Sequence, residues 1–93
     1  LFLLDEPEAA LSPQRQVAFV FLLHETLRAY RDAQFIISTH SPLLLGFPKA
    51  QIMSFDGERI KEISYEDTNS FQIYRRFLND PRDFLKELYL EAT

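Results

Sequence analysis

The chain opens with four consecutive apolar residues, Leu1–Leu4, that end directly at two carboxylates, Asp5 and Glu6. A short uninterrupted apolar run predicts a strand buried on both faces of a parallel sheet, because polar side chains do not alternate along it. In open α/β sheets, ligands bind beyond the carboxyl ends of the strands, which is where the two acids lie. Adjacent carboxylates beside a buried strand cost free energy unless they bind a cation or water, which favours a ligand site. A strand that simply ends in a solvent-exposed loop has the same pattern, so this second interpretation stays open.

The next segments predict a helix followed by a second strand. Ser12 can cap free backbone N–H groups, and Pro13 is preformed for the first position of a helix. The helix is expected over residues 13–30, where apolar side chains recur at spacings of three and four. Residues 34–39, rich in β-branched side chains, are expected to form the second strand. A strand, a helix and a strand make a right-handed unit in which the two strands run parallel.

His40 directly follows the second expected strand. Because parallel strands end at the same edge of a sheet, His40 is expected beside Asp5 and Glu6. An imidazole placed there can donate to a phosphate oxygen or to an attacking water. A histidine in a loop is also commonly a structural residue held by hydrogen bonds, so this second interpretation stays open. Ser38 and Thr39 are expected to support the loop and not to react.

The remainder of the chain predicts a short helical turn, a β-hairpin and two amphipathic helices. Asp56-Gly57 is a tight-turn signal between two strand-like segments. Asp67 or Thr68 is expected to cap the first of the two helices, and Asp80-Pro81 is expected to start the second. The helical turn is expected at residues 41–45 and the two hairpin strands at residues 51–55 and 59–64. The two amphipathic helices are expected to begin at about residue 68 and at residue 81.

Composition limits the possible functions. Ninety-three residues allow one small domain, and 46% hydrophobic content excludes a disordered chain. A net charge of −4, with Arg75-Arg76 as the one adjacent basic pair, argues against direct contact with nucleic acid. Zero cysteines exclude disulfides and thiolate metal sites, and no apolar run is long enough for a membrane span.

Two stretches resemble the motifs of one family. LFLLDEPEAALS, over residues 1–12, resembles the Walker B strand and D-loop of ABC-type ATPases, and FIISTHSP, over residues 35–42, looks like their switch-histidine loop. DEPEAALSP together with THSP is the form found in the soluble AAA-family, or predicted-ATPase, branch of the ABC superfamily. The resemblance covers almost the whole chain, more loosely after residue 65. It implies an α/β fold: a partial P-loop NTPase fold with parallel strands, a C-terminal β-hairpin and two C-terminal helices.

The resemblance also implies site roles that agree with the chemistry of the residues. Asp5 is the candidate Mg²⁺ anchor, because Mg²⁺ takes one or two carboxylates together with waters and substrate phosphates. Glu6 is the candidate general base, with Pro7 expected to hold it in an extended conformation. His40 is the candidate switch residue that senses the γ-phosphate. Ser12 occupies the D-loop position at the interface where two ATPase halves enclose ATP, although it can be a helix cap at the same time.

These inferences describe an incomplete enzyme. The sequence contains no G-x-x-x-x-G-K-[ST] loop, which a P-loop ATPase needs to hold phosphates. Residues 1–93 are therefore expected to be the C-terminal fragment of a longer ABC-type ATPase domain, inactive by itself. The full protein is expected to be cytoplasmic, to bind ATP and Mg²⁺, and to couple hydrolysis to conformational change. It is also expected to form a homodimer, through an ATP sandwich or through exposed apolar surface.

Three alternatives remain open from the sequence. One is a non-catalytic interaction or dimerisation module. The second is an ATPase that controls a DNA-processing activity located elsewhere in the protein. The third is a transport motor, disfavoured because transporters usually have Asp where this chain has Ser12. Away from the site, Glu8, Glu66 and Asp67 are expected to be solvated loop acids, and His24 a surface or interface residue.

Overall fold

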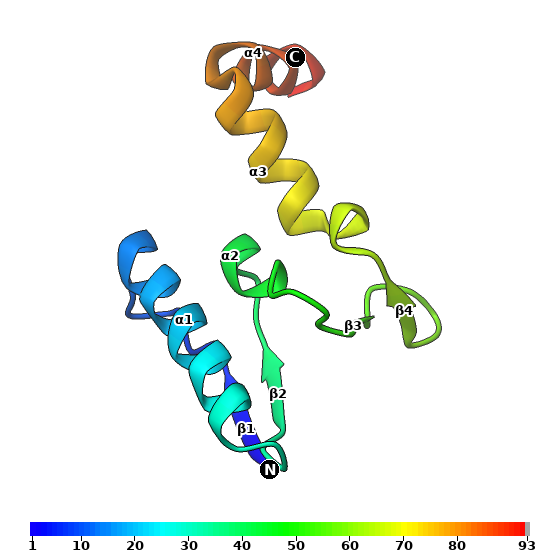
Figure 1. Ribbon diagram of the computed structural model, residues 1–93. Coiled ribbons are helices and arrows are strands. Elements are labelled where there is room, and N and C mark those ends of the chain that lie inside the picture. The colour runs from blue at the N-terminus through cyan, green and yellow to red at the C-terminus, as the bar shows by residue number, and fades with distance from the viewer. Residues whose placement is uncertain (93) are drawn as a thin grey trace. The chain divides into compact units, whose positions relative to one another are not determined.

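A computed structural model describes residues 1–92 of the chain (Figure 1). Its elements divide into two compact units that meet in sequence at Ala50 and Gln51. The first unit contains two strands and two helices. The second contains a β-hairpin, one 3₁₀ turn and two further helices. The order of the strands and α-helices is the one that the sequence predicts, and the 3₁₀ turn is an additional element.

The first unit is built on a parallel strand pair. Strand β1 (Phe2–Asp5) pairs with β2 (Phe35–Ser38) in a register that sets Asp5 opposite Ser38. Helix α1 (Pro13–Ala29) connects the two strands (Figure 1), so the predicted parallel strand–helix–strand order is confirmed. The rings of Phe2 and Phe35 stack with centroids 5.0 Å apart at the start of the pair.

Helix α1 begins as the sequence predicts. The Ser12 hydroxyl accepts a hydrogen bond from the Arg15 backbone N–H at 3.3 Å, and Pro13 occupies the first helical position. Helix α2 (Pro42–Leu45) packs against α1, and each of the two helices has one buried leucine. These leucines, Leu23 and Leu44, are 5% and 6% exposed and form the small apolar core of this unit.

The sequence predicts that strand β1 is buried on both faces, but the structure shows it largely exposed. Leu1 and Leu3 are 72% and 70% exposed, and Phe2 is also exposed. Within residues 1–92, the element that β1 chiefly contacts is β2, which lies beside it in the sheet and does not cover either of its faces. The accompanying expectation of exposed apolar surface is confirmed, and it extends to Val17 and Phe21 on α1.

The second unit begins with an antiparallel hairpin. Strands β3 (Ile52–Ser54) and β4 (Lys61–Ile63) pair so that Met53 lies opposite Glu62. The predicted hairpin is therefore confirmed, with shorter strands. A 3₁₀ turn, η1 (Tyr65–Asp67), leads into α3 (Asn69–Asn79). Among the described residues, no helix combines the length and the apolar character needed to cross a membrane.

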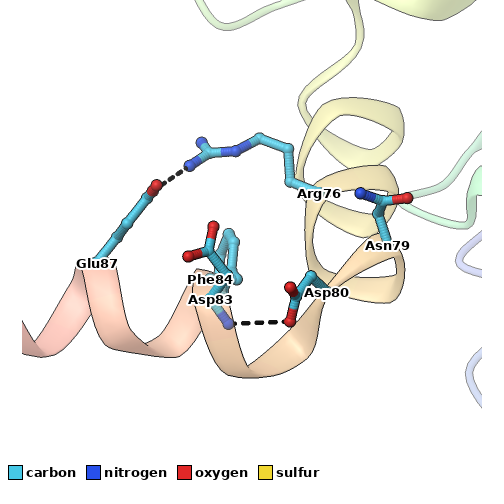
Figure 2. A pocket seen from close by; sticks show the side chains of 6 residues that line it. All are labelled: Arg76, Asn79, Asp80, Asp83, Phe84 and Glu87. Atoms are coloured by element: carbon cyan, nitrogen blue, oxygen red, sulfur yellow. Dashed lines mark hydrogen bonds and ion pairs between the residues drawn. The ribbon is translucent and has the colours of Figure 1, made fainter.

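Helix α4 (Pro81–Ala92) follows α3 after a sharp corner at Asp80 (Figure 2). The Asp80 carboxylate accepts from the Asp83 backbone N–H at 3.1 Å and so caps α4, as predicted. An ion pair of 2.9 Å between Arg76 and Glu87 bridges the two helices, and Phe77 meets Phe84 edge to face. The hollow at this corner is lined by Arg76, Asn79, Asp80, Asp83, Phe84 and Glu87.

Thr68 is the residue on which the start of α3 depends. It is 5% exposed, its hydroxyl donates to the Tyr65 carbonyl at 2.8 Å, and the same oxygen accepts from the Phe71 backbone N–H at 3.2 Å. The predicted cap is therefore Thr68, not Asp67.

Replacing Thr68 with valine keeps the side-chain shape but removes both hydrogen bonds. We expect Thr68→Val to lower the free energy of unfolding by about 1–2 kcal/mol, because the Phe71 N–H loses its side-chain acceptor and the Tyr65 carbonyl loses one of its two donors. Urea denaturation measures the change. Thr68→Ser, which keeps the hydroxyl, is the matched control, and an equal loss of stability in both variants would show that the cap is not the cause.

Candidate functional site

Two residues that are distant in sequence meet where β1 and β2 end. The Glu6 backbone N–H donates to the Ser38 carbonyl at 2.7 Å and extends the strand pairing by one step. Beyond this step, His40 Nδ1 lies 2.6 Å from Glu6 Oε1. An ionised carboxylate only accepts hydrogen bonds, so Nδ1 carries the proton and donates it. The His40 side chain is 85% exposed and that of Glu6 is 37% exposed, which leaves the pair open to solvent.

Asp5 ends β1 at the same edge and is exposed. Among the side chains that the structure describes, those of residues 1–89, no three acidic, imidazole or thiol groups gather into a metal cluster. Mg²⁺ commonly uses one or two protein carboxylates and completes its shell with waters and substrate phosphates. The donor set therefore fits a cation that arrives with a phosphate ligand, and it does not fit a cage made only of protein groups.

Glu6 has a left-handed backbone, with φ of 48°, which corrects the expectation that Pro7 keeps it extended. The chain reverses immediately after β1, and the Ala9 N–H closes this turn onto the Glu6 carbonyl at 3.1 Å. A non-glycine residue in this region costs about 1–3 kcal/mol and persists where surrounding contacts fix it. Here the fixing contacts are the backbone bond to Ser38 and the side-chain bond to His40.

Glu8 is the site residue that the sequence analysis missed. It is half-buried, not a solvated loop acid: its Oε1 accepts from the Thr39 hydroxyl at 2.6 Å, and its Oε2 accepts from the His40 backbone N–H at 3.1 Å. These partners lie more than thirty positions along the chain, so no local pattern signals them. One feature of the sequence could have indicated this role: Glu8 lies in the turn after β1, at the same sheet edge as the loop after β2, whose hydroxyl and N–H groups can donate hydrogen bonds.

A chain of hydrogen bonds continues from Thr39 into α1. The Thr39 hydroxyl accepts from the Ser41 N–H at 3.0 Å, which confirms that Thr39 supports the loop. The Ser41 hydroxyl, buried, donates to Gln16 Oε1 at 2.6 Å, and Gln16 Nε2 donates to the Leu11 carbonyl at 3.1 Å. The loop after β2 is thus tied both to the turn after β1 and to the first turns of α1.

The remaining predicted residues lie apart from this cluster. Ser12 caps α1, and its described side-chain hydrogen bond is the one with Arg15, not with Asp5, Glu6 or His40. His24 is exposed on α1, as the sequence predicts for a surface residue. The structure therefore brings Glu6 and His40 into contact and sets Asp5 at the same edge.

The environment of Glu8 lowers its pKa below the ordinary value of 4.5. Burial acts in the opposite direction, but hydrogen bonds to the charged form outweigh it: first from the Thr39 hydroxyl, then from its own backbone, from the Glu6 side chain and from the His40 backbone. A carboxyl whose folded-state pKa is depressed adds stability above its unfolded pKa. That stability is lost as the pH falls through the folded-state pKa.

We therefore expect Glu8→Gln to destabilise the protein at pH 7, and we expect this effect to shrink as the pH falls from about 4.5, the unfolded-state value, through the lower folded-state pKa at which the wild-type carboxyl becomes protonated. Chemical denaturation of both proteins at a series of pH values measures the difference. Glu58→Gln, at an exposed position in the hairpin loop, is the control for the loss of one acid. A stability difference that stays constant down to pH 3 would contradict the assignment.

Comparison with known proteins places this site inside a recognised segment. A family model described as "AAA domain, putative AbiEii toxin, Type IV TA system" matches residues 1–46. Searches of curated proteins and of solved structures give no significant match. The matched segment contains Asp5, Glu6, Glu8 and His40 together with the strand pair that positions them. Residues 1–46 are therefore similar to an AAA-type, P-loop ATPase-like domain.

Proposed function

We propose that this chain supplies the magnesium-anchoring and water-activating part of an ABC-type ATPase site. The observation that supports the proposal is the 2.6 Å contact between Glu6 and His40 at the shared end of two parallel strands. A structural role alone does not require an exposed carboxylate–imidazole pair at the edge where α/β sheets bind ligands. The similarity of residues 1–46 to an AAA domain also supports nucleotide binding, as a general property of that family.

Glu6 acts as the general base in this proposal. A water attacks the γ-phosphorus of ATP, its oxygen forms the new P–O bond, and the bond to the β–γ bridging oxygen breaks so that ADP leaves. The Glu6 carboxylate accepts the proton of the water, which contributes on the order of 10²–10⁴-fold to the rate. His40 donates from Nδ1 to Glu6 and so fixes the direction of the carboxylate. Its ring, which is 85% exposed, would contact the terminal phosphate of the bound nucleotide.

Asp5 holds the cation that accompanies the nucleotide. Bound Mg²⁺ neutralises charge on the phosphate oxygens during phosphoryl transfer. The exposed position of Asp5 at the strand end allows its carboxylate to reach such an ion directly or through water. Glu6, one residue further, remains engaged with His40.

The phosphate-binding loop must come from another segment, because the 93 residues contain no G-x-x-x-x-G-K-[ST] sequence. We therefore assign residues 1–93 to the C-terminal part of an ABC-type ATPase domain and expect no hydrolysis from them alone. In the complete, cytoplasmic enzyme, two such domains would enclose ATP, with Ser12 near the nucleotide at the D-loop position, and hydrolysis would separate them.

Replacing Glu6 tests the general base. In the full-length protein, Glu6→Gln should retain ATP binding and lower steady-state hydrolysis by roughly 10²-fold or more, because an amide cannot accept the proton. Phosphate release and equilibrium nucleotide binding measure the two effects, with Glu58→Gln as the matched control. Unchanged hydrolysis in Glu6→Gln would reject the role. A wild-type protein that neither binds nor hydrolyses ATP would point to the non-catalytic interaction module.

Replacing Asp5 tests the cation anchor. Asp5→Ala in the full-length protein should abolish magnesium-dependent hydrolysis, since the carboxylate at the strand end is lost while the β1 backbone pairing is kept. A titration of activity against Mg²⁺ concentration measures the effect. Asp56→Ala, in the hairpin loop, is the control for removing one acid. A variant with the wild-type dependence on Mg²⁺ would exclude Asp5 as the anchor.

A further inference from the structure

Both carboxylate oxygens of Glu8 accept hydrogen bonds from the loop that carries His40. Oε1 accepts from the Thr39 side chain at 2.6 Å and Oε2 accepts from the His40 main chain at 3.1 Å. Hydrogen bonds to an ionised carboxylate are about twice as strong as those between neutral groups. Two such bonds to neighbouring residues restrict both translation and rotation of the loop at the position of His40.

The restraint is part of a closed ring of contacts. From Thr39 it passes through Ser41 and Gln16 to the Leu11 carbonyl, which belongs to the same turn region as Glu8. A ring fixes the loop from both sides, whereas a single contact would leave it free to swing. The imidazole of His40 is 85% exposed, so side-chain packing contributes little to its position.

We propose that Glu8 is the positioning residue of His40: its carboxylate clamps the Thr39–His40 backbone and thereby holds the imidazole against Glu6. This role rests on the function proposed above, because a precise Glu6–His40 geometry matters for activating a water. Glu8 contacts neither the nucleotide nor the reacting water in this scheme. It acts through the loop.

The chemistry of the clamp requires a carboxylate. Both partners are donors: the Thr39 hydroxyl already accepts from Ser41, and a backbone N–H can only donate. A glutamine at position 8 keeps one acceptor oxygen for the His40 N–H, but its NH₂ group can no longer accept from the Thr39 hydroxyl, and neither contact then involves a charged group. Glu8→Gln therefore weakens the clamp with little change in side-chain volume.

The test is a double-mutant cycle in the full-length protein. Glu8→Gln in the wild-type background should lower kcat by roughly 10- to 100-fold with the KM for ATP unchanged, as for a misplaced reacting group. In a His40→Ala background, the same substitution should leave kcat unchanged, because the residue that it positions is already absent. Glu58→Gln, an acid outside the site, should leave kcat unchanged in both backgrounds.

A structural measurement accompanies the kinetics. The His40 backbone amide proton should shift upfield in the NMR spectrum of Glu8→Gln and exchange faster with solvent, because its charged acceptor is lost. Should Glu8→Gln fail to fold, Thr39→Val provides a second cycle, since it removes one of the two clamp bonds, together with the acceptor of the Ser41 N–H, and keeps the side-chain shape. Thr39→Ser, which keeps the hydroxyl, should restore kcat.

The outcomes separate the clamp from the proposed function. An equal fall in kcat with and without His40, or an unmoved His40 amide, would overturn the positioning role. Wild-type turnover in Glu8→Gln, in a protein that Glu6→Gln inactivates, would overturn the positioning role and leave the ATPase assignment standing. Wild-type turnover in Glu6→Gln would instead reject the proposed base, and the His40 amide would still decide whether Glu8 holds the loop.

Discussion

The register of the β1–β2 pair is the constraint on which the site depends. Asp5 lies opposite Ser38, so Glu6 leaves the sheet one step beyond Asp5, close to where His40 follows β2. A slip of one residue would move His40 by about 3.3 Å along the edge and turn every β2 side chain to the other face. The Phe2–Phe35 stack fixes the pairing at one end, and the backbone bond from Glu6 to Ser38 fixes it at the other.

Hydrogen bonds, more than apolar packing, order the edge of the sheet. Among the described side chains, residues 1–89, only Leu23 and Leu44 are buried apolar residues, and both lie on helices. The buried hydroxyl of Ser41 serves α1 and α2 at once, since it donates to Gln16 and accepts from the first N–H groups of α2. Satisfied polar networks of this kind rigidify a structure, but removal of one member leaves its partners unpaired.

The sequence predicts the features that local physics determines. The cap at Ser12, the apolar run of β1 and the parallel order of the strands depend on neighbouring residues or on general rules of chain connection, and all three are present in the structure. The turn conformation at Glu6 and the partners of Glu8 depend on a loop more than thirty residues away. The burial of β1 could not be predicted from its own residues, because burial depends on which surfaces cover the strand.

Three acids lie within the four positions 5–8, and the hydrogen-bond partners of each acid explain how this density of carboxylates is tolerated. Carboxylates this close in sequence repel one another unless donors satisfy them. Here Glu6 accepts from the His40 ring, and Glu8 accepts from the Thr39 hydroxyl and the His40 backbone, while the side chains of Glu6 and Glu8 also meet each other. Asp5 remains exposed at the strand end, opposite Ser38. The two acids that have protein donors become fixed in place, whereas the third lies at the open edge of the sheet.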